Sequence, residues 1–209
     1  MIEDMLLVGH GPSLFQRKMG DEIDNYRFVA RVNPGLDVHG ARAYTERPKA
    51  YGTRTDAVCF PLWRLVKGEY VKKNLLRPDV PELWISPSRR YRERHEPDFL
   101  ADVGRVAERY PGRILHAFGA YHRWRKKYNE HETVYGDKRS PSTGIAAILI
   151  ALENYKPEVL VLAGFDNARE GYPSRPNTMG DNSPHPPDIE HRILEEIEDT
   201  YNVELYHIP

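Results

Sequence analysis

Residues 142–166 read Ser-Thr-Gly-Ile-Ala-Ala-Ile-Leu-Ile-Ala-Leu-Glu-Asn-Tyr-Lys-Pro-Glu-Val-Leu-Val-Leu-Ala-Gly-Phe-Asp, and this stretch decides the fold class. Every position from 145 to 152 is apolar, which predicts a helix over residues 142–155 that is buried on all sides. The apolar run 159–163 is short and ends at Gly164, a pattern typical of a central strand in a parallel sheet. A buried helix followed directly by a buried strand is the repeating unit of α/β proteins.

The same alternation extends through the rest of the chain. Apolar patterning predicts further strands over residues 5–8, 26–33, 55–60, 82–86, 113–118 and 203–208, and helices over 62–76, 98–110 and from about residue 187. We therefore expect one Rossmann-like α/β domain over residues 1–209, with a mostly parallel sheet flanked by helices. Such sheets bind ligands at the carboxyl ends of their strands, beside helix N-termini.

Composition excludes several classes of protein. The 30 basic and 31 acidic residues give a net charge of −1, so no overall field attracts nucleic acid or anionic lipid. No stretch approaches the ~18 apolar residues of a transmembrane helix, and the acidic start of the chain does not resemble a secretory signal. We expect a cytoplasmic protein, with a homo-oligomer possible. The single cysteine, Cys59, allows no internal disulfide and is expected to be a small buried apolar residue.

A long segment over residues 167–187 separates Asp166 from the last predicted helix and is rich in proline and glycine. It exceeds the usual length of a connection in an α/β fold. Tyr172 and His185 give it recognition chemistry, so we interpret it as a lid over the strand ends. A plain insertion without function is the alternative.

Several common motifs are incomplete or missing. Residues 9–14, Gly-His-Gly-Pro-Ser-Leu, begin like a dinucleotide fingerprint, but Leu14 stands where the third glycine belongs and Arg31 ends the second strand where a ribose-binding acid is expected. The chain has no phosphate-binding Gly-Lys-Ser/Thr loop and no nucleophile elbow. It also lacks an Asp-x-Asp motif, so we expect no metal, and protein groups must provide any donors to a phosphate.

Two segments could supply such donors. Ser142, Thr143 and Gly144 open the buried helix, where free backbone N–H groups and the positive end of the dipole favour an anion. A simple N-cap role for Ser142 accounts for the same residues. The second segment is Gly11-Pro12-Ser13 after the first strand, for which an ordinary turn is the alternative.

The order of the motifs adds information that no single motif carries. The sequence runs from residues 7–14 (Leu-Val-Gly-His-Gly-Pro-Ser-Leu) through 31–33 (Arg-Val-Asn), 142–144 (Ser-Thr-Gly) and 164–166 (Gly-Phe-Asp) to a histidine in a polar loop. This order resembles the bacterial sialyltransferases of glycosyltransferase family 42. It is also similar to the sialylmotifs of the animal sialyltransferases, family 29.

The resemblance implies a GT-A-like domain that transfers sialic acid, or a related nonulosonic acid, from a CMP-sugar to a glycan hydroxyl with inversion and without a metal. Asn33 matches a nucleotide-contacting asparagine of the family, and Ser142, Thr143 and Gly144 match its phosphate and cytidine contacts. His10 departs from the family because it replaces an asparagine. Phe60 and Pro61 depart as well, since they stand where another donor-binding asparagine is expected, and Tyr172 is a candidate for a tyrosine on the leaving phosphate.

The acceptor hydroxyl needs a base, and His185 is the favoured one. An imidazole with a reference pKa of about 6.5 is largely neutral at pH 7 and can accept a proton. His191 is the competitor and is expected to face solvent. His10 could contact the donor phosphate or simply pack, and Asp166 could hold a ligand hydroxyl or cap a turn.

Two basic stretches, residues 89–95 and 122–127, contain interleaved aromatic residues. A solvated helix face, an anionic ligand surface and nucleic-acid binding are the three interpretations, of which we favour the first.

Two other functions compete with the glycosyltransferase. The start of the chain also resembles pterin pyrophosphokinases, which would require ATP and magnesium, and a nucleotide-binding protein without turnover would account for the missing asparagines.

Overall fold

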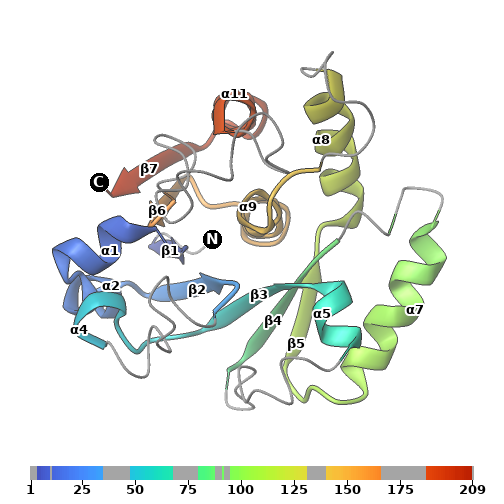
Figure 1. Cartoon of the computed structure of the whole chain (residues 1–209), viewed down its shortest axis with the longest axis horizontal. Coiled ribbons are helices and arrows are strands. Elements are labelled where there is room, and N and C mark those ends of the chain that lie inside the picture. Colours follow the sequence, from blue (N-terminus) through green and yellow to red (C-terminus); the bar gives the residue numbers. More distant parts are fainter. Residues whose placement is uncertain are drawn as a thin grey trace, which may run out of the picture.

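A seven-stranded sheet, parallel throughout, forms the centre of the computed structural model (Figure 1). The structure describes residues 4–9, 11–34, 48–67, 80–87, 91, 95–130, 140–165 and 187–208. The strand order is β5-β4-β3-β2-β1-β6-β7, and each pairing is parallel. The strands are β1 (Met5–Val8), β2 (Phe28–Val32), β3 (Ala57–Pro61), β4 (Glu82–Ser86), β5 (Arg113–His116), β6 (Val159–Ala163) and β7 (Glu204–Ile208). The predicted α/β fold class is confirmed.

The strand order reverses at β1, which is the strand that positions the candidate site. Strands β2 to β5 follow on one side of β1, and β6 and β7 lie on the other. Val8, the last residue of β1, lies between Arg31 of β2 and Ala163 of β6. A reversal of this kind opens a crevice at the carboxyl ends of the neighbouring strands, because the connections leave in opposite directions.

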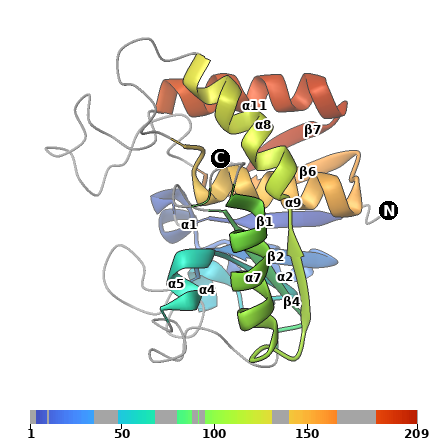
Figure 2. The ribbon, with the colours of Figure 1, turned by 90° about the vertical axis from the view of Figure 1, so that its right-hand side faces the viewer.

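Helices cover both faces of the sheet, as Figures 1 and 2 show. Successive residues of β1 point to opposite faces, so Leu7 packs with one layer of helices and Leu6 with the other. One layer contains α8 (Phe118–Glu130), α9 (Thr143–Tyr155) and α11 (Pro187–Tyr201). The other contains α1 (Pro12–Arg17), α2 (Gly20–Asn25), α4 (Pro48–Tyr51), α5 (Leu62–Val66) and α7 (Glu96–Ala107).

Helix α9 is the buried helix that the sequence predicts. Its residues from Ile145 to Leu152 are each at most 3% exposed. It packs against the middle of the sheet on one side and against α8 and α11 on the others (Figure 1). An apolar surface around the whole circumference is required by this position, because no face of the helix meets water.

Some predicted bounds differ from the observed ones. The helix predicted over 62–76 ends at Val66, and residues 68–79 lie outside the described residues. The strand predicted over 113–118 ends at His116, because α8 begins at Phe118. Of the predicted lid, only Pro187 is described, as the first residue of α11.

Two expectations from the composition, a buried cysteine and no transmembrane helix, can be compared with the structure. Cys59 is fully buried in β3, as predicted, and burial raises the pKa of its thiol. Within the described residues, no helix combines the length and the apolar character needed to cross a bilayer.

Candidate functional site

The loop after β1 is held against the end of β6 by backbone hydrogen bonds. The N–H of Gly9 donates to the carbonyl oxygen of Ala163, and the N–H of Gly11 donates to that of Gly164, both at 2.8 Å. A Cβ on Gly9 would lie 2.4 Å from the Gly164 oxygen, so a side chain would separate the two segments. Glycine is therefore required here by the close approach of two backbones.

Gly164 closes this junction from the other side. Its φ of 68° lies in the left-handed region, which residues with a Cβ adopt at a cost. A Cβ at this position would also lie 2.6 Å from Cδ1 of Leu14, which is fully buried. Leu14, the residue that breaks the dinucleotide fingerprint, thus packs where β1, α1 and β6 meet.

The first turn of α9 lies beside this junction. A Cβ on Gly144 would be 3.0 Å from Cε1 of Phe165, which follows Gly164. The missing side chain of Gly144 therefore leaves room for the Phe165 ring. Gly9 and Gly11 after β1, Gly164 and Phe165 after β6, and the N-terminus of α9 therefore meet at the carboxyl edge of the sheet.

Ser142 caps α9, as its alternative interpretation predicts. Its Oγ accepts a hydrogen bond of 3.2 Å from the N–H of Ile145, and its carbonyl oxygen accepts one of 3.1 Å from Ala146. Within the described part of the chain, the N–H groups of Thr143 and Gly144 have no partner. These two donors point along the helix axis at its positive end, which is the arrangement that binds anions.

A buried carboxylate, Glu190 of α11, also meets the start of α9. Glu190 is 8% exposed, and its Oε1 accepts a hydrogen bond of 2.9 Å from the N–H of Ser142. Its negative charge complements the helix dipole and fixes α11 against α9. Glu190 was not singled out in the sequence analysis. A usable signal was present, because Glu190 stands four positions before Leu194 and so lies on the apolar side of an amphipathic helix, where an acid is unusual.

Asn33 lies at the same edge of the sheet, one strand away from β1. It follows β2 with a φ of 48°, and its N–H donates to the carbonyl oxygen of Cys59 at 2.8 Å. Asparagine is one of the few residues that adopt this conformation readily. Its half-buried side chain is therefore held at the end of β2 by a defined turn.

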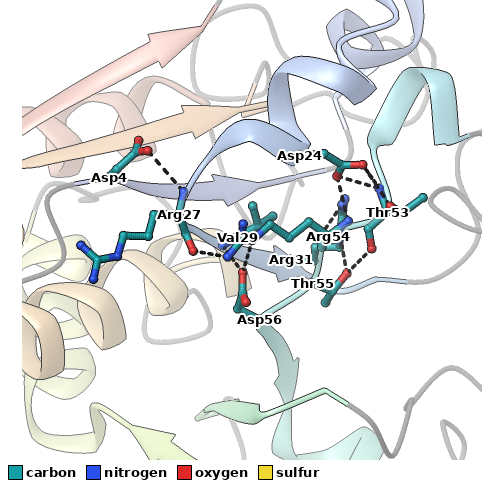
Figure 3. A network of polar contacts seen from close by, with 9 residues as sticks. All are labelled: Asp4, Asp24, Arg27, Val29, Arg31, Thr53, Arg54, Thr55 and Asp56. Carbon is teal, nitrogen blue, oxygen red and sulfur yellow. Dashed lines mark hydrogen bonds and ion pairs between the residues drawn. The ribbon is translucent and has the colours of Figure 1, made fainter.

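Arg31, two residues earlier, has a structural role. Its guanidinium is buried and donates to the carbonyl oxygens of Tyr51 and Arg54 at 2.8 and 2.7 Å, and to the hydroxyl of Thr55 at 2.9 Å. Figure 3 shows this network apart from Tyr51, and in it the N–H groups of residues 53 and 54 also donate to Asp24. Arg31 thus ties the end of β2 to the segment between α4 and β3.

The structure brings part of the predicted site together. Gly11 and the first turn of α9 belong to the surface just described, and Pro12 and Ser13 open α1 directly beside it. The ring of Phe60 and the residue Pro61 are buried at the end of β3, so that strand end presents no polar side chain. His10, Asp166, Tyr172 and His185 lie outside the described residues.

Two other predictions can be compared with the structure. His191 is 54% exposed and pairs with Glu195, so it faces solvent as predicted. On α8, Lys127 pairs with Glu196 at 3.0 Å and lies over the buried ring of Trp124, and Arg123 pairs with an acid of α9. These contacts agree with the helix-face interpretation of residues 122–127. Of residues 89–95, only Tyr91 and His95 are described.

Among the described residues, no group of three or more histidine, cysteine, aspartate or glutamate side chains is arranged to hold a metal ion. Metal independence stays a prediction, since several polar residues near the strand ends are not described.

Searches with models of known protein families and with curated protein sequences give no match. Solved structures do match. The sialyltransferase CstII from Campylobacter jejuni, in complex with the substrate analogue cytidine-5'-monophosphate, aligns with 99% of this chain and 80% of its own at a TM-score of 0.61 and 17% identity. The structure of the same enzyme in complex with CMP-3FNeuAc covers 98% of this chain and 81% of its own. Its TM-score is 0.61 and its sequence identity is 19%.

A mammalian sialyltransferase aligns with 97% of this chain and 68% of its own, at a TM-score of 0.51 and 17% identity. These alignments run over nearly the whole chain, so they include the strand reversal at β1 and the helix that opens with Ser142. The chain therefore has the fold of the sialyltransferases, the fold that the order of its sequence motifs predicts.

Proposed function

We propose that this chain is a single-domain, metal-independent glycosyltransferase that moves sialic acid, or a related nonulosonic acid, from a CMP-sugar to a glycan hydroxyl with inversion. The observation that carries the proposal is the shared fold with a sialyltransferase in complex with CMP, together with two unpaired N–H groups at the start of α9 within the described residues. They adjoin the strand reversal where α/β proteins bind nucleotides.

In this proposal the start of α9 binds the phosphate of CMP. The N–H groups of Thr143 and Gly144 and the hydroxyl of Thr143 donate to its oxygens, while the side chain of Ser142 keeps the helix capped. Gly11, Pro12 and Ser13 line the same surface, and Asn33 contacts the nucleotide from the end of β2. Because negative charge grows on the phosphate as the sugar leaves, donors fixed by a buried helix stabilise the transition state more than the ground state.

Glu190 limits the number of N–H donors at the start of α9 that are available to the phosphate. Its carboxylate already accepts the N–H of Ser142, so the phosphate is left with the donors of Thr143 and Gly144. The negative charge of Glu190 opposes a diphosphate at this helix end more strongly than a monophosphate. This supports a nucleoside monophosphate sugar as the donor, because a diphosphate brings more negative charge to the same helix end.

His185 is the proposed base. It takes the proton of the acceptor hydroxyl while the new bond between that oxygen and the anomeric carbon forms and the bond from this carbon to the phosphate oxygen breaks. Attack opposite the leaving group inverts the anomeric carbon. Tyr172 donates to the departing phosphate, and His10 and Asp166 contact the ligand, with residues 167–187 closing over it as a lid.

Calorimetric titration with CMP, CTP, UDP and ATP, each with and without magnesium, tests the binding step. We expect CMP to bind equally with and without the metal, and Asn33→Ala to weaken it. Thr143→Val removes one hydroxyl at constant shape and should weaken CMP binding at least tenfold, since a hydrogen bond to a charged group contributes about 1.5–3 kcal/mol. The matched control is Thr200→Val on the exposed side of α11, which should bind CMP like the wild type.

Release of CMP from CMP-sialic acid, with galactose-terminated oligosaccharides as acceptors, tests the chemical step. His185→Ala should retain CMP binding and lose about 10²–10⁴-fold in turnover, the usual contribution of a general base. His191→Ala is the matched control and should retain turnover. Binding of ATP that depends on magnesium would favour the pyrophosphokinase, and CMP binding by an inactive wild type would favour the nucleotide-binding protein.

A further inference from the structure

A cavity lies on the other side of the sheet from α9. It has a volume of about 390 Å³, within the range of small-molecule sites, and it lies between α5 and α7. Val66 at the end of α5 and Ala101 of α7 form its apolar lining. The remaining lining residues are polar: Tyr91, His95, Asp98, Asp102 and Arg105.

Helix α7 turns a polar face toward this cavity. His95, Asp98, Asp102 and Arg105 follow one another at spacings of three or four residues, which places them on one side of a helix. Phe99, on the neighbouring side of the helix, is fully buried in the apolar cluster that α7 forms with the sheet. The polar face is not simply a solvated surface, because Asp102 is only 7% exposed.

The polar groups are already oriented by one another. The hydroxyl of Tyr91 donates a short hydrogen bond to Asp102, and Nη1 of Arg105 donates to the same carboxylate at 2.6 Å. Elsewhere in the cavity lining, Nδ1 of His95 lies 3.2 Å from Oδ2 of Asp98. A guanidinium carries five N–H donors. The single hydrogen bond that Arg105 makes within the described residues therefore leaves most of its donors to a ligand.

We propose that this cavity is a second ligand site and that it binds a neutral sugar unit. A sugar carries several hydroxyls, each of which both donates and accepts, so different hydroxyls of one ring can donate to Asp98 and accept from Arg105. The apolar Val66 and Ala101 suit the C–H face of a pyranose ring. Two carboxylates against one guanidinium disfavour an anion, so phosphate and sialic acid are poor occupants.

This site is distinct from the proposed CMP site, because α5 and α7 cover the face of the sheet opposite to α9 (Figure 1). Its existence does not depend on the proposed transferase activity. A neutral sugar bound there would give the protein a second point of contact with a glycan.

Titration of the full chain with lactose and with maltose, followed by NMR of backbone amides, tests the proposal. We expect a saturable response centred on α7. Asp98→Ala and Ala101→Phe should each weaken binding at least tenfold, which corresponds to about 1.4 kcal/mol. Both positions are exposed, so the variants should fold. Arg105→Ala should have a similar effect, and Arg109→Ala, an exposed arginine just beyond α7, is the control that should bind like the wild type.

CMP titration of the same variants separates this proposal from the transferase. CMP binding should be unchanged in all of them, whether or not the chain proves to be a transferase. The proposal is overturned if neither sugar gives a saturable response at α7, if Ala101→Phe binds the sugar like the wild type, or if sialic acid or phosphate occupies the cavity in preference to neutral sugars.

Discussion

Replacing Gly164 by alanine should destabilise the protein strongly, because two independent costs meet at this residue. The left-handed φ of 68° costs an alanine about 1–2 kcal/mol. The new Cβ would also lie 2.6 Å from Cδ1 of the fully buried Leu14, and overpacking of this kind costs about 1–3 kcal/mol. We expect a total loss of about 3 kcal/mol, which is a large part of the stability of an ordinary domain.

Urea denaturation followed by circular dichroism measures this loss. With an m-value of about 2 kcal/mol/M, the midpoint should fall by about 1.5 M. The matched control is Gly104→Ala on α7, where an added Cβ meets nothing within 4 Å. That variant should gain about 0.5–1 kcal/mol, because glycine is the poorer helix former.

A double variant isolates the contact with Leu14. Leu14→Ala alone opens a cavity and should cost about 2–5 kcal/mol. Combined with Gly164→Ala, it removes the steric conflict between the new Cβ and the Leu14 side chain. The double variant should therefore lose less unfolding free energy than the sum of the two single variants, by about 1 kcal/mol or more. Wild-type stability of Gly164→Ala, or strict additivity in the double variant, would refute this account of the β1–β6 junction.

Two further predictions concern the network in Figure 3. Burial acts to raise the pKa of Asp24, but hydrogen bonds from Arg54 and Thr53 outweigh it and the pKa is lowered. The stability that Asp24 contributes is therefore complete above its unfolded pKa of about 3.9 and is lost as the pH falls through the lower folded value. As the pH falls between these two pKa values, the difference in unfolding free energy between wild type and Asp24→Asn should shrink. A difference that is independent of pH would contradict this role of Asp24. Arg31→Met should lose about 2–4 kcal/mol because it leaves the buried carbonyl group of Tyr51 and the partly buried one of Arg54 without this donor. The exposed Arg17→Met should be neutral by the same denaturation measurement.

The strands were the most predictable part of the fold. The runs at residues 5–8, 82–86 and 159–163 coincide with β1, β4 and β6, since a strand buried on both faces carries a continuous apolar run. In β4 this run is Leu83–Ile85, between the buried polar residues Glu82 and Ser86. The buried helix α9 was readable for the same reason, because its apolar run is too long for a strand and opens with the capping residue Ser142.

The short helices α1, α2 and α4 were not predicted. Each has six residues or fewer, which is too short to display a helical period. Pro12 at the start of α1 was a usable signal, since proline favours the first helical turn. Tertiary packing fixes these elements, and such packing is not encoded in any local pattern.

The candidate site could be predicted only in outline. The order of strands and loops placed Gly11, Asn33 and Ser142 at one edge of the sheet. Two contacts in the site join segments that are distant in sequence. Glu190 accepts a hydrogen bond at the capped end of α9, and Phe165 packs on Gly144. Contacts of this kind follow from the tertiary structure and had no counterpart in the motifs.

The central claim is that CMP binds at the start of α9, and NMR of backbone amides during a CMP titration without magnesium tests it most directly. The account predicts that the amides of Thr143 and Gly144 show the largest saturable shifts, and that cytidine, which lacks the phosphate, leaves them nearly unchanged. Saturable binding of CMP that leaves these two amides unperturbed, or no binding until magnesium is added, would contradict it.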